Sequence, residues 1–74
     1  MLVFELDSKQ QAVEVHADRE GIDQLIHELE VLKQAGSQNH VDLMTVERGA
    51  GELSSNVQST DDILINHVKI VFWP

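Results

Sequence analysis

The chain has 74 residues, and its thirteen acidic and five basic side chains give a formal net charge of −8. A chain of this length forms one domain (residues 1–74), and its acidity argues against binding to nucleic acid or to an anionic membrane surface, which attract lysine and arginine. The absence of cysteine excludes disulfides and thiolate zinc sites, and no apolar run approaches the ~20 residues that span a bilayer.

The N-terminal half of the sequence predicts a hairpin followed by a helix. Residues 2–7 and 11–17 alternate apolar with polar side chains around a short polar connection, which is typical of two paired strands. Asp18 is a good helix N-cap, and Gly36 is a residue type that commonly ends a helix. Between them, apolar residues at spacings of three and four form one stripe, from Ile22 to Leu32.

The C-terminal half predicts two more strands with a long loop between them. Residues 40–44 alternate, and a strand from Ile63 to Phe72 follows a loop of residues 47–62, in which Gly49 and Gly51 are expected to adopt positive φ. Loops of this length are usually functional or disordered. The order ββαββ predicts an α+β fold, a four-stranded antiparallel sheet with the helix packed on one face. The expected core joins the helix stripe to Leu2, Phe4, Leu6, Val13, Val15, Val41, Leu43, Val68, Ile70 and Phe72.

The other face of this sheet is expected to be uncovered, and strand alternation places polar residues on it. His40 and Asp42 share one strand face, and His67, Glu14 and His16 fall on the same side of the sheet. Histidines beside a carboxylate would suit zinc, so His40, Asp42 and His67 are candidate metal ligands. The alternative is a solvated face of ordinary polar residues, and we expect neither a metal nor another cofactor.

The same face carries apolar residues that favour a protein interface. Ile65, Val71 and Trp73 share the outer side of the last strand with Lys69, which makes this face more apolar than a solvated sheet face should be. Tryptophan is also frequent at binding hot spots. The pattern therefore predicts a contact surface for a protein partner or for a second copy of the chain.

The sequence does not predict an enzyme. It contains no cysteine nucleophile, no G-x-S-x-G motif and no phosphate-binding loop of the G-x-x-x-x-G-K type. The N-terminal residues include acids and no basic segment, which is unlike a signal peptide. We expect a cytoplasmic binding protein with no catalytic residues.

Short motifs resemble the immunity protein 32 family of bacterial polymorphic toxin systems. They are H-V-D-L-M-T (His40–Thr45), G-E-L-S (Gly51–Ser54) and N-H-V-K-I (Asn66–Ile70), placed after a hairpin and a helix, so that the resemblance covers nearly the whole chain. It implies a small protein that neutralises a toxin by occluding its active site. An acidic protein can occupy the basic cleft of a nuclease toxin, because complementary charges speed and orient the encounter.

This interpretation assigns partner contacts to the strand, loop and last-strand residues that carry polar or large apolar side chains. They are His40, Asp42, Met44, Glu47, Arg48, Glu52, His67 and Trp73. The glycines of the loop are expected to form the bend that orients Glu52 and Leu53. Two alternatives remain open, a domain that dimerises through the open sheet face and a small metal-binding protein.

Overall fold

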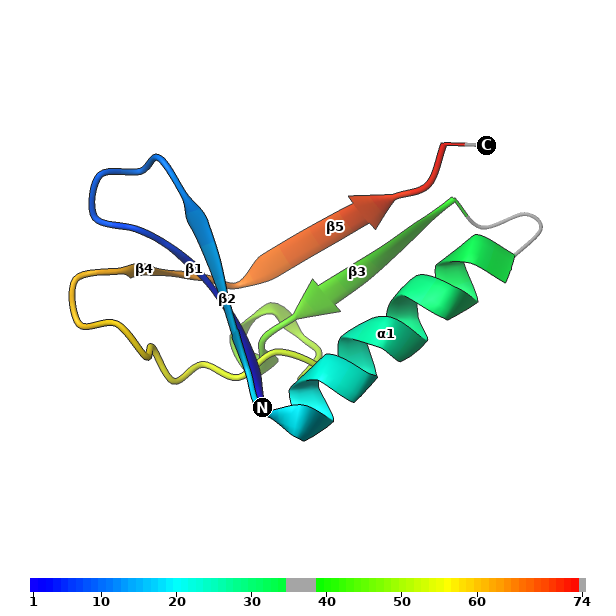
Figure 1. The fold of residues 1–74 in the computed structure, drawn as a ribbon, viewed down its shortest axis with the longest axis horizontal. Coiled ribbons are helices and arrows are strands. Elements are labelled where there is room, and N and C mark those ends of the chain that lie inside the picture. The colour runs from blue at the N-terminus through cyan, green and yellow to red at the C-terminus, as the bar shows by residue number, and fades with distance from the viewer. Residues whose placement is uncertain (35–38, 74) are drawn as a thin grey trace.

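The computed structural model describes residues 1–34 and 39–73, and within these ranges the strands form two separate antiparallel sheets. The elements are β1 (Leu2–Leu6), β2 (Val13–Ala17), α1 (Arg19–Gln34), β3 (His40–Met44), the 3-10 helix η1 (Val46–Arg48), β4 (Ile63–Ile65) and β5 (His67–Val71). A three-stranded sheet has the order β2-β1-β4, and a two-stranded sheet joins β3 to β5. Figure 1 shows the two sheets diverging from a shared junction, with α1 beside β3. Neither helix in these ranges has the length and apolar composition needed to cross a bilayer.

The chain is α+β, but the predicted single four-stranded sheet is wrong because the last strand is divided at Asn66. The part before Asn66 pairs with β1, and the part after it pairs with β3. Thr45 fixes the position of Asn66 through two hydrogen bonds. The backbone N–H of Thr45 donates to the Asn66 carbonyl oxygen at 3.0 Å, and the Thr45 hydroxyl donates to the Asn66 side-chain oxygen at 2.7 Å. The division also shifts the strand alternation, so that Ile65 and Val68 both pack against the core. The prediction that Ile65 faces outward is therefore wrong.

The hairpin and the start of the helix form as the sequence predicts. β1 and β2 pair antiparallel along their whole length, and the side chain of Asp7 accepts the backbone N–H of Gln11 at 2.8 Å in the turn between them. Asp18 is the N-cap of α1, and its Oδ1 accepts the backbone N–H of Gly21 at 2.9 Å. Gly36, the expected end of the helix, lies outside the described residues.

The core lies where the two sheets meet. Leu2 and Phe4 of β1 pack there against Leu43 of β3 and Leu53 of the loop before β4. Leu53 is only 2% exposed, although sequence alternation did not assign it to the core. Partly buried side chains complete the cluster, and they are Ala17, Leu25, Ile65, Val68 and Ile70.

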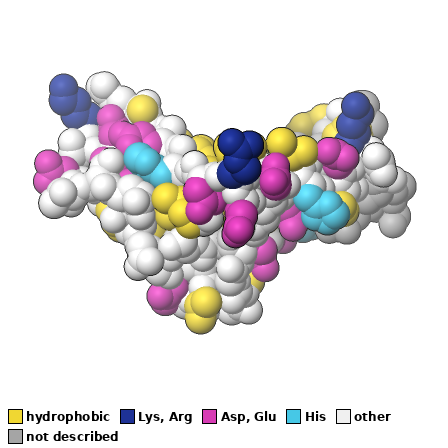
Figure 2. All heavy atoms as spheres, turned by 60° about the horizontal axis from the view of Figure 1, so that its bottom comes forward, with side chains coloured by type: hydrophobic (Ala, Val, Ile, Leu, Met, Phe, Trp, Pro, Cys, Tyr) yellow, Lys and Arg dark blue, Asp and Glu magenta, His cyan; other side chains and the backbone are white. Residues whose placement is uncertain are grey.

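Much of the predicted core is exposed instead. Val13 and Val15 are 59% and 46% exposed, and three residues of the helix stripe, Ile22, Ile26 and Leu29, are also exposed. The reason is the split sheet: α1 runs beside β3, and only its first turn lies near the three-stranded sheet (Figure 1). Figure 2 shows hydrophobic side chains in the hollow between the two lobes of the molecule. The expectation that Val13 and Val15 are buried in the core is wrong.

The central strand β1 is buried on both sides, because the long loop before β4 covers the face that was expected to be open. Val3 and Glu5, which point away from the Phe4 side of the strand, are both fully buried. The backbone N–H of Ser54 donates to the Leu2 carbonyl oxygen at 2.8 Å, which fixes the loop across the sheet. The face that was expected to be open is therefore open only on the two-stranded sheet.

Candidate interaction surface

The register of β3 and β5 brings six accessible side chains together on one face of the two-stranded sheet. We call this the outer face, and it consists of His40, Asp42 and Met44 of β3 and, directly opposite them, Val71, Lys69 and His67 of β5. Val41 and Leu43 point to the other side and are buried. Four of the eight predicted contact residues thus lie on one face. Glu14 and His16 do not join them, because they belong to the other sheet.

Asp42 is the centre of a small polar network on the outer face. Its Oδ1 lies 2.8 Å from Nε2 of His67, and its Oδ2 lies 3.3 Å from Nε2 of His40. The hydrogen bond with His67 lowers the pKa of Asp42 below its ordinary value, and the charges of His40, His67 and Lys69 act in the same direction against a partial burial that raises it. Asp42 therefore stays ionised and holds both rings in place.

This network does not have the form of a metal site. The two imidazoles lie on different oxygens of one carboxylate, and in residues 1–34 and 39–73 the grouping with converging ligand atoms is elsewhere in the fold. The expected candidates His40, Asp42 and His67 are brought together, with His67 hydrogen-bonded to Asp42 and His40 at ion-pair distance from it. Their arrangement suits recognition of a polar surface, since it presents fixed donors and one carboxylate.

The loop residues predicted as contacts differ in whether their side chains are accessible to a partner. Glu47 and Arg48 are exposed on η1, and the Ser55 hydroxyl donates to Glu47 at 2.6 Å, which lowers the pKa of that carboxyl. Glu52 acts within the molecule, because its carboxylate accepts the backbone N–H of Met44 at 3.1 Å. Gly49 ends η1 with φ of +106°, as expected.

The predicted bend at Gly51 and its role for Leu53 need correction. Among the described residues Gly51 does not have positive φ, and Leu53 points into the core instead of toward a partner. Trp73 behaves differently: it is 85% exposed, just beyond the end of β5. A tryptophan this exposed leaves most of a large apolar surface in water, which is the usual property of an unoccupied contact residue.

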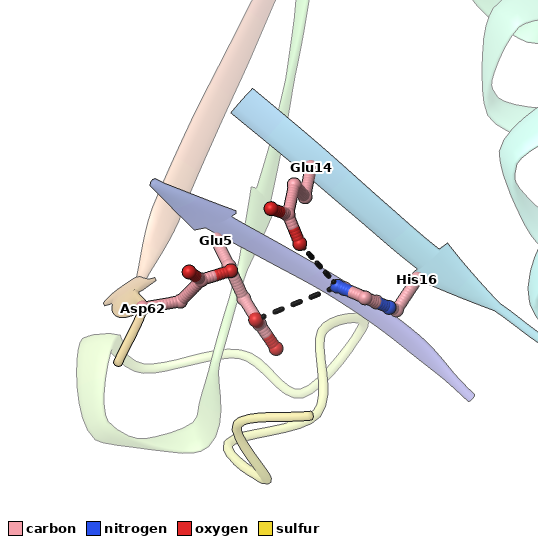
Figure 3. A group of neighbouring side chains, drawn as sticks. All are labelled: Glu5, Glu14, His16 and Asp62. Carbon is pink, nitrogen blue, oxygen red and sulfur yellow. Dashed lines mark hydrogen bonds and ion pairs between the residues drawn. The ribbon is translucent and has the colours of Figure 1, made fainter. Parts of the chain in front are cut away.

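A second polar group lies on the three-stranded sheet. We call it the acidic cluster; it contains Glu5 of β1, Glu14 and His16 of β2 and Asp62 just before β4, and one ligand atom of each lies within 4.8 Å of the others (Figure 3). Nε2 of His16 lies 2.9 Å from Glu14 and 3.5 Å from Glu5. Sequence alternation missed this group because it placed Glu14 and His16 on an open face shared with His40 and His67. One feature of the sequence could have indicated this group, the single carboxylate of Glu5 in the otherwise apolar strand L-V-F-E-L.

Glu5 is the anchor of the acidic cluster. Its carboxylate is fully buried and accepts the backbone N–H of Gln58 at 2.6 Å and that of Ser59 at 3.3 Å. Burial by itself would raise the pKa of Glu5, but these two hydrogen bonds, the Asp62 carboxyl and the charge of His16 hold it below its ordinary value. The carboxylate stays ionised and ties the loop to the sheet.

The pKa of Asp62, in contrast to that of Glu5, is shifted upward. Burial, followed by the neighbouring carboxyl groups of Glu5 and Glu14, raises its pKa to about 6. Its buried Oδ2 has no hydrogen-bond donor among the described residues. Oxygen and imidazole ligands of this kind could hold a divalent cation. The raised pKa of Asp62 is also the behaviour of a carboxyl that shares a proton with its neighbours, which is a second way to stabilise the same arrangement.

Comparisons of the chain with models of known families, with curated proteins and with solved structures gave no match.

Proposed function

We propose that this chain is a cytoplasmic protein-binding module, a toxin-neutralising immunity protein that occludes the active site of a partner toxin. The observation that carries the proposal is the outer face with Trp73 beside it: fixed polar groups next to a large apolar side chain that is 85% exposed. Interfaces use such aromatic residues for affinity and the polar groups around them for specificity.

The charge of the chain supports a basic partner. A net charge of −8 on 74 residues attracts a protein with a positive cleft and raises the rate at which the two meet. Asp42 on the outer face and Glu47 on η1 both have lowered pKa values, so both offer negative charge at neutral pH. Carboxylates in these positions would stand where the phosphates of a nuclease substrate otherwise bind.

The class of partner comes from the resemblance of His40–Thr45, Gly51–Ser54 and Asn66–Ile70 to the immunity protein 32 family. Binding in this proposal is non-catalytic and requires no cofactor. The toxin is inactivated because its active site is covered.

The test is co-expression with the product of the neighbouring gene, which this proposal expects to be a toxin. We expect rescue of growth and a complex that survives purification, and Trp73→Ala should weaken that complex at least about 30-fold if Trp73 is a hot spot. Asp42→Lys should weaken it as well, while the same charge change at the exposed Asp61 should have a much smaller effect. Absence of both a complex and growth rescue would sink the proposal.

A further inference from the structure

A second surface, separate from the outer face, is apolar and uncovered. We call it the inner face, and it consists of Val13, Val15, Ile22, Ile26, Leu29 and Ile63, each of which is exposed by 43–59%. On the three-stranded sheet, Val15 lies opposite Phe4, while Val13 and Ile63 both lie opposite Leu6, so these side chains share one side of the sheet. On α1, the row from Ile22 to Leu29 runs next to Leu25, which packs against the core.

The molecule exposes more surface than a folded monomer of its size should. A monomer of 8.3 kDa exposes roughly 4,600 Å², whereas this chain exposes 5147 Å². The excess of roughly 550 Å² is of the order of the ~800 Å² that each partner contributes to a standard stable interface. The radius of gyration, 12.8 Å, also exceeds the ~11.3 Å expected for a compact chain of this length. Both values are those of a chain that leaves an apolar face uncovered, as the inner face is.

The charges around the inner face indicate what covers it. The carboxylates of the three-stranded sheet, Glu5, Glu14 and Asp62, gather in the acidic cluster on the opposite side, and Asp42 lies on the outer face. The strands therefore bring no carboxylate to the inner face, and on α1 the apolar row has charges of both signs beside it, Asp23 and Glu30 along one side and Arg19 and Lys33 at its two ends. An apolar surface of the same kind fits it better, and a second copy of this chain supplies one.

We infer that the inner face is a homodimer interface, in which the Ile22–Leu29 row of α1 and the Val13–Val15 edge of β2 in one copy are covered by the same elements of the other. A two-fold contact of this kind is self-complementary and closed, so it ends at two copies. This inference does not rest on the proposed toxin, because the two surfaces share no residue.

The net charge of −8 opposes the dimer, and this gives the dimer a recognisable salt dependence. Two acidic copies repel each other at long range, and salt screens that repulsion. The dimer should therefore become tighter as sodium chloride rises from about 0.05 to 0.5 M, over which the screening length shortens severalfold. A complex with a basic protein would become weaker over the same range.

The test is analytical ultracentrifugation of the full chain from about 1 μM to 1 mM, a range that covers weak and moderately tight complexes. We expect a monomer–dimer equilibrium, and Ile26→Glu should raise its dissociation constant at least about tenfold, because the dimer would bury an unpaired carboxylate. Val31→Glu is the matched control, since Val31 is similarly exposed on the opposite side of α1. Val13→Glu on the edge strand gives a second variant in case Ile26→Glu fails to fold, with circular dichroism as the check.

Two outcomes would overturn the inference. One is a wild-type chain that stays monomeric over the whole concentration and salt range. The other is a dimer that persists in folded Ile26→Glu and Val13→Glu but is lost in Val71→Glu, which would place the contact on the outer face. Neither outcome affects toxin binding, which Ile26→Glu should leave intact.

Discussion

The buried carboxylate of Glu5 accepts the backbone N–H of Gln58 at 2.6 Å, so the central strand holds a loop that lies 53 residues further along the chain. In this loop the backbone N–H groups of Gln58 and Ser59 donate to the Glu5 side chain instead of to a neighbouring strand. A fully buried carboxylate of this kind must keep its donors, since an unpaired buried charge is strongly unfavourable.

Glu5→Ala should release the loop. We expect a lower melting temperature and faster amide hydrogen exchange at residues 54–62, because Gln58 and Ser59 lose their acceptor. Hydrogen exchange followed by mass spectrometry is the measurement. Gln11→Ala, an exposed change in the hairpin turn, is the control and should leave exchange in the loop unchanged.

Asp62→Asn should stabilise the chain at neutral pH. The pKa of Asp62 is raised to about 6, so its contribution to stability is full below the ordinary carboxyl pKa of about 4 and is lost as the pH rises through 6. An amide cannot ionise, and its N–H groups can donate to Glu5 and Glu14. The variant should therefore gain stability relative to the wild type between pH 4 and 7, measured by urea unfolding.

Asp61→Asn, the same change at the exposed neighbouring position, is the control for this experiment and should alter the unfolding free energy by less than about 0.5 kcal/mol. If Zn²⁺ or Mn²⁺ raised the wild-type melting temperature and Asp62→Asn abolished that rise, the acidic cluster would be a cation site, and the shared proton would be the wrong explanation.

Asp42 should contribute to stability in the opposite pH range. Its hydrogen bond with His67 lowers its pKa, so its contribution is full above the ordinary carboxyl pKa of about 4 and is lost as the pH falls through the lowered value. The stability difference between the wild type and Asp42→Asn should therefore shrink as the pH falls below about 4. A difference that stays constant down to pH 2 would show that the Asp42–His67 contact does not stabilise the fold.

Leu53→Ala should cost about 2–5 kcal/mol of unfolding free energy, the usual loss for a buried leucine. Leu53 is 2% exposed and packs against Leu2, Phe4 and Leu43 at the junction of the two sheets. Val57→Ala, in the same loop but exposed, should change the unfolding free energy by less than about 1 kcal/mol. Chemical denaturation of the two variants decides whether Leu53 is part of the core.

Local sequence patterns predicted the elements whose stabilising contacts are local. The hairpin follows from two alternating segments around Asp7, and the start of α1 follows from Asp18, because a cap acts on residues three positions away. The shared side of His40 and Asp42 also follows from alternation, since both residues lie within one strand. These predictions needed no knowledge of which strands are neighbours.

The arrangement of the sheets could not be predicted in the same way. The segment Ile63-Leu64-Ile65 is apolar throughout, which indicated that its surroundings differ from those of the rest of the last strand. The cause is that this segment pairs with β1, and the sequence did not indicate that pairing. The acidic cluster depends on the same pairing, because Asp62 reaches Glu5 only when β4 lies beside β1. Burial of Glu5 also requires the loop, whose path is set by contacts between residues far apart in the sequence.

The division at Asn66 has a consequence for the order of folding. The nine residues from Ile63 to Val71 supply the third strand of one sheet and half of the other, so the two-stranded sheet has no partner strand until this segment is present. Both pairings join distant parts of the chain, and such contacts form late because closing a long loop costs entropy. During synthesis the hairpin and α1 emerge first, and the junction between the lobes assembles only when the final strand arrives.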